Sequence, residues 1–175
     1  METKSKSIFS KIVKYSDLVQ AMVDGLTKEW VKVDMSTFGE YRVENKKGIL
    51  GYFSSPKKVC YGCAATNTLC ELMGKPFPVD TVGLNYKRAE TLNLTRAELT
   101  SFELSVDDLR KGHIISSTEL FLDYMQWGNS SISESERDAI LSIAGKMDLP
   151  LMYCKDLEQL NKYQLFATEL KNNNL

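Results

Sequence analysis

The sequence of 175 residues lacks both a long apolar run and an excess of charge of either sign. No stretch approaches the roughly 18 consecutive apolar residues that a membrane-spanning helix needs. The chain has 22 basic and 23 acidic residues, so it has no net positive field to attract a polyanion. The sequence therefore predicts no membrane span and no nucleic-acid partner.

A secretion signal and a disulfide framework are also missing. The lead-in carries lysines at 4, 6, 11 and 14, and Ser10 and Lys11 interrupt its apolar residues, so no signal-peptide core forms. Four cysteines in a chain of this length do not make a disulfide scaffold. We therefore expect a cytoplasmic protein with reduced cysteines, in which residues 1–15 form a frayed basic N-terminus.

Motifs for nucleotide chemistry and for paired acid-base catalysis are scarce as well. No G-x-x-x-x-G-K or G-x-G-x-x-G run is present, and most of the ten glycines lie where turns and helix stops need them. The closely spaced carboxylates are Asp107-Asp108 and Glu134-x-Glu136, and each pair lies at an expected helix start, where acids interact favourably with the helix dipole. The sequence predicts no cofactor.

What the chain does have is the composition of one folded domain. Its content of 43% hydrophobic and 26% charged residues is typical of a globular protein. Helical periodicity with start and stop signals recurs along most of its length. We predict a mainly α (α+β) fold, a single globular domain over 1–175 built as a bundle of about six or seven helices. We also predict a small β-hairpin near residues 31–53 and a flexible tail at 171–175.

Capping residues and apolar spacing set the expected helices. Two helices are expected over about 17–30 and 60–73. Two more follow the capping boxes that begin at Thr95 and Ser133, and three others begin at Ser105, Ser116 and Asp156. Strands are expected within 31–35, 41–43 and 49–53. Residues 75–94 show no clear period and are expected to form a long connection, with 79–84 as a candidate short strand.

Three of the four cysteines, Cys60, Cys63 and Cys70, lie in one segment rich in small residues that ends at Gly74. In a helix, positions 60, 63, 67 and 70 fall on one face, as a stripe of Cys, Cys, Asn and Cys. The simplest interpretation is a buried and closely packed helix face, because an unreacted cysteine behaves as a small hydrophobic residue.

A catalytic interpretation takes Cys63 as a nucleophile. In the first turn of a helix, the positive end of the helix dipole stabilises a thiolate, so the thiol ionises more readily. The single histidine of the chain, His113, is the candidate base. A cysteine early on a helix with a later histidine before an apolar run loosely resembles papain-like cysteine peptidases, and the resemblance implies a cysteine-dependent hydrolase. No glutamine-glycine motif precedes Cys63 to form an oxyanion hole.

Two other chemistries would use the same thiols. Cys60 and Cys63 form a C-x-x-C pair that suits thiol redox exchange. A zinc site would take Cys60, Cys63 and Cys70 with Cys154 or His113 as the fourth ligand, but structural zinc sites usually combine two such ligand pairs. We therefore predict no metal, and we keep the hydrolase and redox interpretations as alternatives.

With no complete catalytic or cofactor motif, the sequence favours a non-catalytic protein-binding module over an enzyme. Its eight tyrosines and two tryptophans, Tyr61 among them, belong to residue types that are enriched at interface hot spots. An immunity-type inhibitor, which neutralises a bacterial toxin by direct binding, needs a complementary surface and no chemistry of its own. We therefore expect a protein partner.

Overall fold

The computed structural model describes residues 8–34, 37, 39–44, 57–76, 85–127, 132–147 and 157–175. In chain order its elements are η1 (Ile8–Lys11), α1 (Tyr15–Lys28), β1 (Lys32–Val33), β2 (Glu40–Glu44), β3 (Lys57–Gly62), α2 (Ala64–Met73), α3 (Asn85–Leu92), α4 (Arg96–Arg110), α5 (Ile114–Trp127), α6 (Glu134–Lys146) and α7 (Leu157–Asn172). The protein is mainly α-helical with one small sheet, as the sequence predicts. Within these ranges no helix has the length and apolar character needed to cross a membrane.

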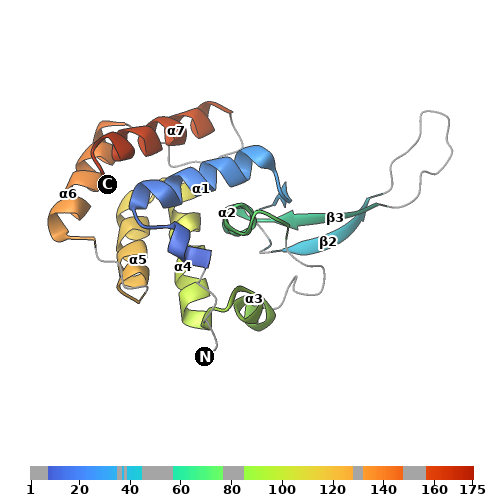
Figure 1. Ribbon diagram of the computed structural model, residues 1–175. Helices are drawn as coiled ribbons and strands as arrows, with labels where there is room; N and C mark the ends of the chain where they lie inside the picture. Colours follow the sequence, from blue (N-terminus) through green and yellow to red (C-terminus); the bar gives the residue numbers. More distant parts are fainter. Residues whose placement is uncertain are drawn as a thin grey trace.

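Helix α1 is the centre of the helical part. It packs against α2 on one side and against α7 on another, while α4 packs against both α5 and α2 (Figure 1). Its apolar residues recur with helical spacing, and Leu18, Val19 and Met22 are fully buried. The sheet extends from the α2 side of the molecule, and α6 lies at the opposite end (Figure 1).

Two expected capping boxes and the glycine stop of α2 are confirmed, whereas α1 and α5 begin at Tyr15 and Ile114, about two residues before their expected starts. The Glu98 amide donates to Thr95 Oγ1 at 3.2 Å and the Thr95 amide donates to Glu98 Oε2 at 2.7 Å, which completes the capping box of α4. Ser133 and Glu136 make the same two hydrogen bonds at the start of α6. Gly74 ends α2 with a φ of 68°, a left-handed conformation that glycine adopts without steric cost.

The prediction of a single helix over 60–73 is wrong in its first turn. Residues Lys57–Gly62 form strand β3, and α2 begins at Ala64 after its N-cap residue Cys63. Strand β3 is hydrogen-bonded to β1 on one edge and to β2 on the other, and these ladders outweigh the helical spacing of its small residues. Cys60 therefore lies on a strand, and the predicted helical stripe keeps only Asn67 and Cys70 within α2.

Two further boundaries differ from the prediction. Helix α4 runs without a break through Ser105, where we expected a new helix to begin. The Ser105 hydroxyl donates to the Ser117 carbonyl at 3.1 Å, so this serine serves a tertiary contact and not a cap. Helix α3 occupies part of the expected connection at 75–94, and it buries only Ala89 and Leu92 among its described side chains, too few to reveal a period. The candidate strand at 79–84 lies outside the described residues.

The sheet has the order β1-β3-β2, with β1 parallel and β2 antiparallel to β3. Tyr61 of β3 is paired with Lys32 on one side and with Glu40 on the other. The structure thus contains an antiparallel strand pair that includes part of the expected hairpin region. The partner of β2 is, however, β3 at residues 57–62, which lies beyond the predicted range of 31–53. The strand expected at 49–53 and the turn before it lie outside the described residues.

Residues near both ends of the chain contribute to the core. Phe9 and Ile12 are buried within the segment that we expected to be frayed. In the expected flexible tail, α7 continues to Asn172 and the Leu175 side chain is only 8% exposed. The reason is the apolar surface of these residues, which removes enough area from water to hold the adjoining backbone in place.

Candidate functional site

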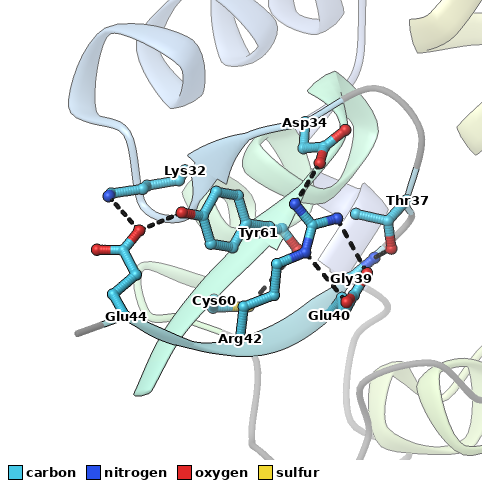
Figure 2. A network of polar contacts seen from close by, with 9 residues as sticks. All are labelled: Lys32, Asp34, Thr37, Gly39, Glu40, Arg42, Glu44, Cys60 and Tyr61. Carbon is cyan, nitrogen blue, oxygen red and sulfur yellow. Dashed lines mark hydrogen bonds and ion pairs between the residues drawn. The ribbon is translucent and has the colours of Figure 1, made fainter. Parts of the chain in front are cut away.

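One face of the sheet carries a compact group of charged side chains around Tyr61, which we call the Tyr61 face; it consists of Lys32, Asp34, Glu40, Arg42, Glu44 and Tyr61 (Figure 2). The strand period of two places Glu40, Arg42 and Glu44 on the same side of β2. The register Glu40↔Tyr61 brings the aromatic ring to that side. Three short strands and Asp34, which directly follows β1, thus bring together six side chains that the sequence distributes over thirty positions.

Arg42 connects the ring to two carboxylates. Its guanidinium carbon lies 4.6 Å from the centroid of the Tyr61 ring, a distance typical of a cation–π contact. Its Nη1 is 2.7 Å from Asp34 Oδ2, and its Nε is 3.0 Å from Glu40 Oε1. These contacts lower the pKa of Glu40, chiefly through its hydrogen bond with Arg42, and they raise the pKa of Arg42. The guanidinium is thereby held in one orientation.

Lys32 and Glu44 fix the other side of the ring. Lys32 Nζ is 2.6 Å from Glu44 Oε1 and 5.6 Å from the Tyr61 ring centroid. The Tyr61 hydroxyl donates to the same Glu44 oxygen. The hydrogen bond to Glu44 raises the pKa of Tyr61, and the hydrogen bond from Lys32 to Glu44 raises that of the lysine. The tyrosine therefore remains a neutral hydrogen-bond donor at physiological pH.

The Tyr61 face is partly exposed to solvent. The side chains of Lys32, Arg42 and Glu40 are 52%, 38% and 49% exposed. Exposed ion pairs contribute little to folding stability, so this group of contacts is poorly explained as a device for holding the fold together. A tyrosine and an arginine held rigidly at a surface are, in contrast, well suited to bind another protein, because little side-chain freedom is lost on binding.

Cys63, the predicted nucleophile, is buried at the N-cap of α2. The residue is 1% exposed, and its Sγ lies 3.6 Å from Thr66 Oγ1. Burial raises the pKa of the Cys63 thiol, and the nearby Asp107 carboxylate raises it further. The sequence argument relied on the helix dipole to lower this pKa, but loss of solvent around the thiolate outweighs the dipole. The thiol is consequently kept protonated, which is unfavourable for a nucleophile.

His113, the predicted base, lies between α4 and α5 and is half exposed. Its Nδ1 is 3.8 Å from Asp108 Oδ1, and its side chain is 51% exposed. Cys63 and His113 thus have different neighbours, Thr66 and Asp107 for the thiol and Asp108 for the imidazole. Neither arrangement is the direct thiol–imidazole contact that activates a catalytic cysteine.

The remaining predicted thiols are distributed over different environments. Cys60 lies on β3, is half-buried, and has a raised pKa because of burial, which a hydrogen bond with Tyr41 partly offsets. Cys70 is buried in α2, and Cys154 lies outside the described residues. Cys60, Cys63 and Cys70 are reduced. Over the described ranges, no three His, Cys, Asp or Glu side chains cluster in a way that would hold a metal ion.

Asn67, the fourth member of the predicted stripe, has a structural role that the sequence did not reveal. Its Oδ1 accepts a hydrogen bond from the Val31 amide at 3.1 Å, and its Nδ2 donates to the Cys63 carbonyl at 3.4 Å. The side chain is fully buried and provides an acceptor for the Val31 amide, while the Cys63 carbonyl also accepts from the Asn67 backbone amide. It thereby joins the chain that leaves α1 to the start of α2.

From the sequence, Tyr61 is a candidate only as one member of the tyrosine and tryptophan set, and the five charged residues of the Tyr61 face are not predicted. The available signal was the alternation Glu-Tyr-Arg-Val-Glu at 40–44, which places three charges on one side of a strand. Comparisons with protein-family models, with curated proteins and with solved structures return no match for this chain, so the geometry of the site carries the functional argument.

Proposed function

We propose that the protein is a non-catalytic protein-binding module that contacts its partner through the Tyr61 face, and more narrowly an immunity-type inhibitor that neutralises a bacterial toxin by direct binding. The single observation that carries the proposal is the half-buried Tyr61 ring at the surface of the sheet, held between Arg42 and Lys32. Tyrosine and arginine are typical of the few residues that dominate binding energy at interfaces.

The narrower proposal is supported by the character of the site. An inhibitor needs a preformed surface and no reactive group, and the Tyr61 face combines fixed charges with an aromatic ring. The alternative of a cysteine-dependent hydrolase or redox protein is disfavoured by the raised pKa of Cys63 and its burial. Cytoplasmic localisation is part of the same proposal, since a direct inhibitor of a toxin acts where the toxin does.

The test compares variants of the face with a matched variant elsewhere. Immobilised wild-type protein is expected to retain one protein partner from native lysate in stoichiometric amount. Against the purified partner, Tyr61→Ala and Arg42→Ala should each raise the Kd by at least about 30-fold, since hot-spot truncations cost 2 kcal/mol or more. The toxin-inhibitor form further predicts that wild type abolishes the partner's toxic activity at a 1:1 ratio, while Tyr61→Ala does not.

Arg137→Ala is the matched control, because Arg137 is also an arginine in a surface ion pair but lies on α6, away from the sheet (Figure 1). It should leave the Kd within about twofold of wild type. Circular dichroism establishes that all variants are folded. A partner that binds Tyr61→Ala and Arg42→Ala as tightly as wild type, or a repeated lack of any stoichiometric partner, would overturn the proposal.

A further inference from the structure

Helix α6 is poorly anchored compared with the central helix α1. Of its thirteen residues, only Ile140 and Ala144 are buried, whereas nine of the fourteen residues of α1 are buried. The stabilisation that a helix gains from the rest of the fold follows the apolar area that it removes from water. The docking of α6 is therefore weak relative to that of α1.

Hollows border α6 on three sides, where it meets the α4–α5 turn, residues 13–15 with Leu175, and α7. They have volumes of about 520, 230 and 430 Å³. Leu141 faces the first of them, Ile140 the second and Ile143 the third. Apolar side chains that face open space have no atoms to contact on that side, so they lose part of their packing energy.

Each hollow also contains a large apolar side chain that belongs to the rest of the molecule and remains exposed. These side chains are Ile115, Val13 and Leu165, which are 59%, 59% and 60% exposed. They line the first, second and third hollow respectively. On the α6 side, Leu141 and Ile143 are half-buried and Ile140 is buried, so the exposed apolar surface at these hollows lies mainly on Val13, Ile115 and Leu165. The contact between α6 and its surroundings is therefore incompletely packed.

The helix itself is well formed at its N-terminus. The capping box of Ser133 and Glu136 satisfies its first backbone donors, and the hydrogen bonds with Ser133 lower the pKa of Glu136. An ion pair of 2.6 Å joins Arg137 to Glu119 of α5, with the Glu119 side chain 54% exposed. Such exposed ion pairs contribute little to stability, so this one adds little to docking.

We propose that α6 is a detachable helix, which undocks from α5 and α7 as a unit while the rest of the protein stays folded. Undocking exposes the buried Ile140 and Ala144 next to Val13, Ile115 and Leu165, which are already more than half exposed, and so joins them into a larger apolar surface. This inference stands on packing alone and does not depend on the proposed protein-binding function.

Native-state hydrogen exchange tests the proposal, because an undocked helix of thirteen residues is marginal in water and its amides exchange once it opens. In the wild-type protein, the α6 amides should exchange at least about tenfold faster than those of α1 and α2, with a much weaker dependence on urea. Arg137→Ala should speed exchange in α6 by about two- to fivefold, in line with the loss of one exposed ion pair.

The decisive comparison uses Leu26→Ala, which removes a buried side chain of α1 away from α6. This variant should speed exchange in α1 and α2 strongly and leave the α6 rate unchanged, since undocking of α6 does not require the rest to unfold. If Leu26→Ala fails to fold, Val23→Ala on the same helix gives the same comparison with a smaller deletion. An α6 rate that rises by the same factor as the α1 rate, or α6 protection equal to that of α1 in wild type, would overturn the proposal.

Discussion

At the scale of single residues, Tyr15 gives the stability of the protein a distinct dependence on pH. The residue is fully buried, its hydroxyl donates to Ser117 Oγ at 2.9 Å, and burial raises its pKa from 10.0 to about 12. Between these pH values the unfolded chain loses the phenolic proton while the folded protein keeps it. The folded state then binds more protons, so the free energy of unfolding must fall as pH rises.

We expect this group to contribute roughly 2–3 kcal/mol of stability below pH 10 that is lost progressively as pH approaches 12. Comparing the urea unfolding of the wild type with that of Tyr15→Phe separates the contribution of Tyr15 from the contributions of other groups that titrate in the same pH range. The variant should be less stable by about 1 kcal/mol at neutral pH, because one buried hydrogen bond is lost. That difference in the free energy of unfolding should shrink by about pH 11. If the difference between the two proteins instead stays constant from neutral pH to pH 11, the pH dependence does not come from Tyr15.

The same scale explains how much of the candidate site the sequence revealed. Spacing correctly placed Cys63 at the beginning of a helix, but its pKa depends on burial and on Asp107, which lies 44 positions later in the chain. Local sequence contains no information about either effect. The Tyr61 face likewise depends on which strands pair, and the register Glu40↔Tyr61 becomes visible only once β3 is known to be a strand.

At the scale of elements, the contact between α1 and α2 depends on the absence of a side chain at Gly25. A Cβ at this position would lie 2.6 Å from the Asn67 carbonyl oxygen and 2.8 Å from its carbonyl carbon, and backbone atoms cannot easily move aside. We expect Gly25→Ala to lower the free energy of unfolding by about 1–3 kcal/mol, even though alanine favours helix formation. Urea unfolding measures the change.

Gly145 in α6 is the matched control, because a Cβ added there would meet no atom within 4 Å. Gly145→Ala should stabilise α6 by about 0.5–1 kcal/mol through helix propensity alone. Opposite signs for the two substitutions would confirm that close packing, not propensity, decides the effect at Gly25. A Gly25→Ala variant at least as stable as wild type would mean that α1 and α2 tolerate a wider separation.

Elements also differ in how well the sequence predicted them. Helices with local signals were anticipated closely, α1 through its apolar spacing and α6 through its capping box. The errors fall where distant partners decide the outcome. Pairing with β1 and β2 makes Lys57–Gly62 a strand, and the hydrogen bond to Ser117 allows Ser105 to lie within α4.

At the scale of the whole molecule, the first and last helices of the described chain lie side by side and bring distant segments together. Lys14 Nζ donates to the Asn174 carbonyl at 2.6 Å, and the Leu175 amide donates to the Leu170 carbonyl at 2.9 Å. The Leu175 side chain is thereby directed toward Val13 and Tyr15. We therefore expect contacts made by residues 174 and 175 to stabilise the start of α1.

Leu175→Ala tests that requirement, because it removes most of a buried side chain without touching α1 itself. We expect it to lower the free energy of unfolding by about 1–3 kcal/mol. The lower end of this range is expected, because a hollow already adjoins Leu175 and fewer packing contacts are lost. Asn172→Ala, an exposed substitution in the last turn of α7, should stay within about 0.5 kcal/mol of wild type. Urea unfolding followed by far-ultraviolet circular dichroism and by tryptophan fluorescence measures both. If residues 170–175 help to hold the core, the two signals for Leu175→Ala shift together to lower urea; an unchanged midpoint would show that α1 is held by α2 and the body of α7 alone.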